Sequence, residues 1–119
     1  MTNDIRAQLR FLPISAHKVR LVIDTVRGKN ANRALEILRF LPQHAAQPVM
    51  KLLDSAIANA EENLGISRDD LIVAEIFADE GPTRKWRRFG ARGRFKPILR
   101  RSSHVTMILR EREAKQPAR

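Results

Sequence analysis

The stretch that decides the fold begins at residue 71 and is Leu71-Ile-Val-Ala-Glu-Ile-Phe-Ala78. It is almost wholly apolar, with only Glu75 interrupting, which predicts a strand covered on at least one face. A second run, residues 104–110, alternates with the period of a strand, and its two sides are Val105, Met107 and Leu109 against His104, Thr106 and Arg110. If the two strands pair, residues 81–97 form a connection too long for a tight turn, so it is either disordered or a projecting ribbon.

This connection carries nearly all of the net charge. Residues 84–101 contain nine of the 23 Lys and Arg residues and none of the 13 acids, which leaves 14 cations against 13 acids elsewhere. The nine are Arg84, Lys85, Arg87, Arg88, Arg92, Arg94, Lys96, Arg100 and Arg101. A formal net charge of +10 concentrated in one segment is expected to attract a polyanion.

Aromatic residues are interleaved with these cations. Trp86, Phe89 and Phe95 are half of the six aromatics in the chain. Guanidinium groups fork onto phosphates, and aromatic rings offer stacking faces worth about 1–3 kcal/mol per base. A charged segment that served only to keep the protein soluble would contain both acidic and basic residues and no large aromatic residues. The pattern therefore favours nucleic-acid binding. For Trp86, close to a strand end, packing on the domain core is an equally good interpretation.

The length of the segment suggests a long arm. As an extended ribbon it would reach on the order of 26 Å beyond the domain, at about 3.3 Å per residue. Its like charges repel one another, and Gly90 and Gly93 loosen the tip. We therefore expect the arm of the free protein to be mobile and to become ordered on a polyanion.

The residues before position 71 predict one more strand and three helices. Residues 5–12 alternate, with Ala7, Leu9 and Phe11 on one side and Arg6, Gln8 and Arg10 on the other, and Pro13 ends the strand. Ser15 is a candidate N-cap for a helix of about three turns that Gly28 ends, with the apolar stripe Val19, Val22, Ile23 and Val26.

Two further helices follow. Asn30 or Asn32 can cap a short helix that Pro42 ends, with the stripe Ala31, Ala34, Leu35 and Leu38. The strongest helical pattern begins near Pro48 and stops at Gly65, with the stripe Val49, Leu52, Leu53, Ala56, Ile57 and Ala60.

A second basic group lies on or beside the first of these helices, and its members are His17, Lys18, Arg20, Arg27 and Lys29. Arg20 can pair with Asp24 one turn on, an interpretation as good as phosphate binding. Lys18 and Lys29 have no acid at comparable spacing and are the better phosphate candidates.

Length and composition indicate one small domain, residues 1–119, with residues 112–119 as a frayed polar tail. The absence of Cys excludes disulfides and thiolate sites and suits the cytosol. The N-terminus lacks the pattern of a signal peptide, and no apolar run approaches the ~20 residues of a membrane span. We expect neither secretion nor membrane insertion.

The sequence offers no catalytic constellation. It lacks phosphate-binding glycine loops and the nucleophile elbow, and His17, His44 and His104 are widely separated, without a second ligand at metal spacing. Capping, packing or phosphate contact is the better interpretation for each His. We expect no enzymatic activity, no metal, no cofactor and no small-molecule substrate.

Several motifs, in this order, resemble the bacterial-type large-ribosomal-subunit protein twenty-two family: Ser15-Ala-His-Lys-Val-Arg20, Val26-Arg-Gly-Lys29, Ser55-Ala-Ile-Ala-Asn-Ala60-Glu61, Asp79-Glu-Gly-Pro82, Ala91-Arg-Gly-Arg94 and Ser103-His-Val-Thr-Met107. The resemblance spans residues 6–111. It implies an α+β fold of three helices on a three-stranded antiparallel sheet, with a long protruding β-hairpin over residues 81–99. Gly90 and Trp86 depart from the family pattern, which usually has basic residues there.

The resemblance also implies a place of action. Such proteins sit in the cytoplasmic ribosome, bind large-subunit ribosomal RNA beside neighbouring ribosomal proteins, aid assembly, and line the nascent-peptide exit tunnel with the hairpin tip. Carried over by position, the tip is Arg88, Phe89, Gly90, Ala91, Arg92, Gly93 and Arg94. The expected RNA-binding residues are Lys18, Arg20, Lys29, Arg84, Lys85, Trp86, Arg87, Arg88, Phe89, Arg92, Arg94, Phe95, Lys96, Arg100 and Arg101. A general DNA-binding module is the alternative hypothesis, because the same cations would serve it.

Overall fold

The computed structural model describes residues 4–89 and 95–112, and the side chains of residues 85–89 and 95–98 lie outside that description. The elements in chain order are β1 (Asp4–Leu12), α1 (Ala16–Ile23), α2 (Ala31–Phe40), α3 (Ala46–Leu64), a 3₁₀ turn η1 (Arg68–Asp70), β2 (Leu71–Glu80), β3 (Arg84–Phe89), β4 (Phe95–Arg100) and β5 (Ser103–Glu111). Three helices and a three-stranded antiparallel sheet confirm the expected α+β class. None of the helices described is long and apolar enough to cross a membrane.

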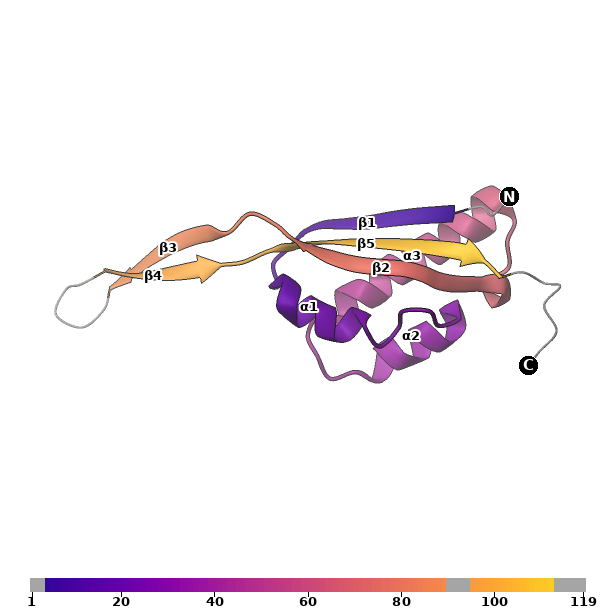
Figure 1. Ribbon diagram of the computed structural model, residues 1–119, viewed down its shortest axis with the longest axis horizontal. Coiled ribbons are helices and arrows are strands. Elements are labelled where there is room, and N and C mark those ends of the chain that lie inside the picture. The colour runs from indigo at the N-terminus through magenta and orange to yellow at the C-terminus, as the bar shows by residue number, and fades with distance from the viewer. Residues whose placement is uncertain (1–3, 90–94, 113–119) are drawn as a thin grey trace.

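The sheet has β5 at its centre, with β1 on one side and β2 on the other, both antiparallel to it. The predicted inward set of β5, Val105, Met107 and Leu109, is fully buried. Thr106 faces the other side, opposite Gln8 and Phe77, and is buried because it stands on the central strand. α3 packs on β1 and β5, while α1 and α2 pack on β2, which leaves one face of the sheet open (Figure 1).

Strand β1 departs from its predicted alternation near its end. Ala7 and Leu9 are partly buried as expected, but Phe11 is 62% exposed and Leu12 is buried in its place. The pairing register with β5 shifts between Leu9 and Leu12, and Phe11 has a φ of 57°. A bulge of this kind turns the following side chains over, so placing Phe11 on the covered side was wrong.

Helix α1 is shorter than predicted, with eight residues, or about two turns. Ser15 stands at the N-cap, but its side chain makes no capping hydrogen bond. After Ile23 the chain tightens, because the N–H groups of Thr25 and Val26 donate to carbonyls three residues back. The apolar stripe continues through this turn to the buried Val26, which is why periodicity alone extended the helix.

The other two helices match their predictions closely. Asn30 is the cap of α2, and its side chain accepts from the N–H of Asn32 at 2.9 Å. α3 ends at Gly65, which has the left-handed φ of 65° that a C-terminal glycine supplies. The predicted stripes of both helices contribute to one core shared with the sheet.

Strands β3 and β4 pair antiparallel, from Arg84 opposite Arg100 to Phe89 opposite Phe95. This two-stranded ribbon, here called the arm, extends from the end of the sheet where β2 finishes and β5 begins (Figure 1). The molecule measures 68 × 25 × 19 Å along its principal axes. The segment between the two strands, residues 90–94, lies outside the described residues.

Candidate nucleic-acid interface

The base of the arm is held closed by contacts between its two chains. The N–H of Gly81 donates to the carbonyl of Ser102 at 2.9 Å, and the Ser102 hydroxyl donates to the carbonyl of Pro82 at 2.8 Å. A Cβ at position 81 would lie 2.5 Å from Ser102 Oγ, so a residue other than glycine would force this contact to shift. The two strands therefore leave the domain side by side.

The arm brings the predicted basic residues onto one ribbon. Arg84 and Arg100 face each other across the ladder, and Arg88 is opposite Lys96. Like charges directly opposite are unfavourable in a sheet, so a bound anion would relieve their repulsion. Among side chains that are described, Arg84, Arg100 and Arg101 are exposed and make no ion pair.

Most other predicted arm residues are placed by backbone alone or not at all. The backbone positions in β3 and β4 are known for Lys85, Trp86, Arg87, Arg88, Phe89, Phe95 and Lys96, but their side chains lie outside the description. The predicted tip residues Gly90, Ala91, Arg92, Gly93 and Arg94 lie outside the described residues altogether.

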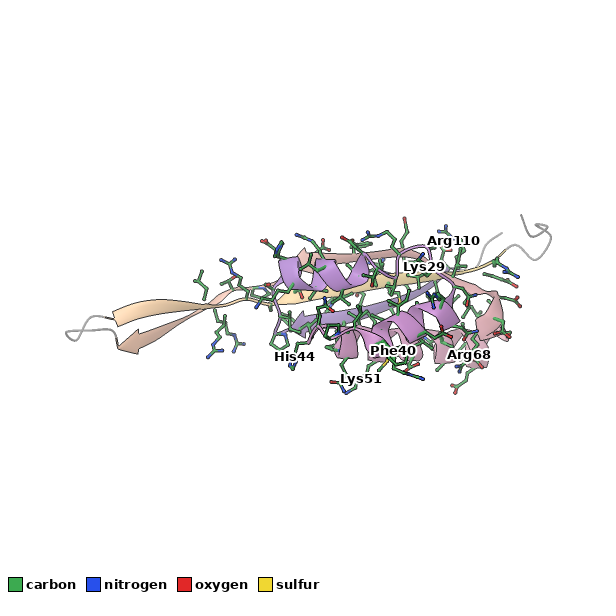
Figure 2. The ribbon with its side chains drawn as sticks, turned by 90° about the horizontal axis from the view of Figure 1, so that it is seen from below. Lys29, Phe40, His44, Lys51, Arg68 and Arg110 are labelled. Carbon is green, nitrogen blue, oxygen red and sulfur yellow. The ribbon has the colours of Figure 1, made fainter. Side chains whose placement is uncertain are left out.

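The second basic group divides into two kinds of residue. Nε and Nη2 of Arg20 donate to the Ala78 carbonyl at 3.2 and 2.8 Å, while Asp24 pairs with Arg27 at 2.6 Å. Of the two interpretations of Arg20, pairing with Asp24 was therefore wrong, because the Arg20 side chain reaches the outer edge of β2. Lys18 and Lys29 are exposed and remain the candidates for phosphate contact, and Lys29 is labelled in Figure 2.

Helix α1 begins beside the arm. A cleft of about 280 Å³ lies between Ser15, Ala16 and His17 on one side and Glu80, Gly81, Thr83, Arg101 and Ser102 on the other. The fold thus places the start of α1 and the predicted arm residue Arg101 on the walls of one cleft.

Two other clusters of polar residues have structural roles. Arg110 binds Asp4 through two hydrogen bonds of 2.8 and 3.2 Å, and this contact lowers the pKa of the Asp4 carboxyl and raises the pKa of the Arg110 guanidinium. The pair ties β1 to β5 at the end of the sheet away from the arm. Nδ1 of His104 accepts from the N–H of Phe11 at 3.0 Å.

Across residues 4–89 and 95–112, no group of three or more His, Cys, Asp or Glu is arranged to hold a metal ion.

Phe11 is the residue that the sequence interpretation missed. It lines a second cleft at the base of the arm together with Arg84, Arg100 and Arg101. The signal was available, since two consecutive apolar residues, Phe11 and Leu12, break the alternation just before Pro13. Alternation within a short strand does not reveal which of the two will be turned outward.

These features define a class of small α+β domains that carry their excess charge on a two-stranded arm. The profile described as ribosomal protein L22p/L17e matches residues 7–110. The large ribosomal subunit protein uL22 of Clostridium kluyveri is 48% identical over 110 residues, which are 92% of this chain and 99% of that protein. The protein of the same name from Desulfitobacterium hafniense is 48% identical over 108 residues, 91% and 95% of the two chains. The chain belongs to the ribosomal protein L22p/L17e family.

Proposed function

We propose that the chain is a structural, non-catalytic component of the large ribosomal subunit in the cytoplasm, where it binds large-subunit ribosomal RNA and contacts neighbouring ribosomal proteins. The observation that carries the proposal is the arm, a two-stranded ribbon that extends from the domain within residues 84–101, a segment with nine cations and no acid. Among the side chains that the structure describes, Arg84, Arg100 and Arg101 are exposed and make no ion pair, and their guanidinium groups are suited to phosphate oxygens. Family membership supports the ribosome as the place where this RNA is met.

The finer part of the proposal concerns the tip, residues 88–94. In the family that this chain resembles, the tip lines the exit tunnel near the nascent peptide, and the arm helps to assemble the surrounding RNA. A density map of ribosomes that contain this chain should show residues 88–94 at the tunnel wall. A tip buried in RNA away from the tunnel would contradict this part alone.

The RNA proposal is tested by removing charge from the described part of the arm. Replacing Arg84, Arg100 and Arg101 with Gln should weaken binding to large-subunit RNA. It should also reduce the slope of log affinity against log salt by about 2 to 3, since each phosphate contact contributes about 0.7–0.9. The measurement is filter binding at several salt concentrations.

The matched control removes the same charge from the helical side, with Arg33, Arg39 and Lys51 replaced by Gln (Figure 2 labels Lys51). Equal losses in the two triple variants would contradict an arm-based interface. Competition with duplex DNA of equal length tests the class of ligand. Equal affinity for DNA and RNA would favour a general DNA-binding module instead.

A further inference from the structure

A cleft of about 480 Å³ lies at the base of the arm, where the first rung of the arm ladder meets the domain. Its lining is aromatic, apolar and cationic, and consists of Phe11, Pro13, Pro82, Arg84, Arg100, Arg101 and Ser102. No acidic residue lines it. The volume is within the range of about 300–1,000 Å³ that ligand-binding clefts occupy.

Phe11 is presented in this cleft at a cost to the fold. It is 62% exposed, although burying a Phe side chain would contribute about 1.5–3 kcal/mol. Its φ of 57° is an outlier for a bulky residue, and strain of this kind collects at functional sites.

His104 holds Phe11 in this position by two contacts. Its Nδ1 accepts the backbone N–H of Phe11 at 3.0 Å, and the two rings meet edge to face with centroids 4.9 Å apart and an interplanar angle of 88°. An edge-to-face pair contributes about 0.5–1.5 kcal/mol, so this contact favours the orientation in which the phenyl ring lies against His104.

The arginines of the cleft lack acidic partners. Arg84 and Arg100 are neighbours across the first rung of the arm ladder, and Arg101 follows directly in the chain. All three are exposed, and the four ion pairs found among described side chains involve other residues. Three guanidinium groups beside one exposed aromatic ring match a nucleotide, because the ring can stack on a base while the cations meet phosphates.

We propose that this cleft binds one unpaired nucleotide of the RNA, with its base stacked on Phe11 and its flanking phosphates held by Arg84, Arg100 and Arg101. The proposal rests on the proposed function and adds a defined site to it, on the domain side of the arm. Pro13 and Pro82 supply apolar walls on which the edges of the base and sugar pack. An acidic peptide of a neighbouring protein would use the cations but would have no need of the aromatic face.

The test compares variants of the full chain for affinity toward large-subunit RNA across several salt concentrations. Phe11→Ala should weaken binding about 5- to 150-fold, the range expected from the loss of one stacked base, and the salt slope should not change because no charge is lost. Phe11→Trp should retain affinity. Phe11→Leu, which keeps apolar bulk without a flat face, should lose affinity like Phe11→Ala.

Phe40→Ala is the matched control, because Phe40 is 81% exposed at the end of α2 and belongs to the helical side of the domain (Figure 2). It should leave affinity unchanged. The midpoint temperature of thermal unfolding of every variant should stay close to that of the wild type. If Phe11→Ala destabilises the domain, the comparison of Phe11→Leu with Phe11→Trp decides the result.

The outcomes separate the two proposals. If the wild type fails to bind large-subunit RNA, the proposed function fails. If the wild type binds and the triple arm variant is weakened while Phe11→Ala or Phe11→Leu binds like the wild type, only the nucleotide site is overturned. Unchanged RNA affinity together with loss of a neighbouring ribosomal protein would assign the cleft to a peptide and overturn the proposal.

Discussion

Ser102 and His104 occupy the space that a side chain at position 81 would need. An added Cβ at Gly81 would lie 2.5 Å from Ser102 Oγ and 3.3 Å from both the Ser102 carbonyl carbon and His104 Nε2. Contacts under 3.0 Å force a neighbour to move, and here the neighbour is a short side chain already hydrogen-bonded to the Pro82 carbonyl. At the scale of single residues, this glycine therefore sets how closely the two chains meet at the base of the arm.

Gly81→Ala is expected to lower the free energy of unfolding by about 1–3 kcal/mol, the usual cost of overpacking. Ser102→Ala alone should cost about 0.5–1.5 kcal/mol, because one hydrogen bond is lost. In the double variant Ser102 Oγ is absent, so the combined cost should be smaller than the sum of the two single costs. Urea unfolding of the four proteins measures this, and additive costs would show that the Gly81 contact is not the source of the effect.

At the scale of elements, the outer edge of β2 is covered rather than left open. The N–H of Gly28 donates to the Val73 carbonyl and the N–H of Val73 to the Lys29 carbonyl, each at 2.8 Å. Further along, the guanidinium of Arg27 donates to the Ile76 carbonyl, as that of Arg20 does to Ala78. An uncovered edge strand is a template for unwanted pairing, so these contacts from α1 and its following turn protect the sheet.

Two neighbouring cations on α1 should therefore behave differently. Arg20→Met is expected to lower the free energy of unfolding by about 1 kcal/mol, through loss of the bonds to Ala78, with little effect on RNA affinity. Lys18→Met should leave stability within about 0.5 kcal/mol of the wild type but weaken RNA binding and reduce its salt slope. Denaturation and filter binding on the same two proteins check this, and a reversed pattern would assign phosphate contact to Arg20.

The hydrophobic period of the sequence locates an element correctly when the apolar side chains of that element all face the shared core. This holds for α3 and β5, which were therefore located well from the sequence. Hydrophobic spacing failed where the backbone changed course without changing its apolar pattern, at the end of α1 and at the bulge in β1. The concentration of charge in residues 84–101 was visible in the sequence. The cleft beside this segment could not be seen in the sequence, because the cleft depends on a contact between Phe11 and His104, which are 93 residues apart in the chain.

At the scale of the whole molecule, the arm makes the protein much longer than a compact chain of its size. The Cα radius of gyration is 17.8 Å, whereas a compact domain of this length would have about 13.5 Å. The nine cations of residues 84–101 repel one another, which favours an extended segment over a compact one.

Small-angle X-ray scattering of the free protein should therefore give a radius of gyration near 18 Å if the arm is extended in solution as it is in the structure. A variant with a short Gly-Ser turn in place of residues 84–100 should fall to about 13 Å. A wild-type value equal to that of the shortened variant would mean that the arm collapses onto the domain in solution.

The way the arm is joined to the sheet also decides how the protein would respond to mechanical force. Both chains of the arm continue directly into strands of the sheet, β3 from β2 and β4 into the central strand β5. A pull along the arm would draw β2 and β5 together in the same direction and load the β1–β5 ladder in shear. Because antiparallel hydrogen bonds lie perpendicular to the strands, a force along the strands would be shared by all of them, so they would not break one after another. The arm is thus anchored so that several hydrogen bonds of the sheet would share a force applied along it.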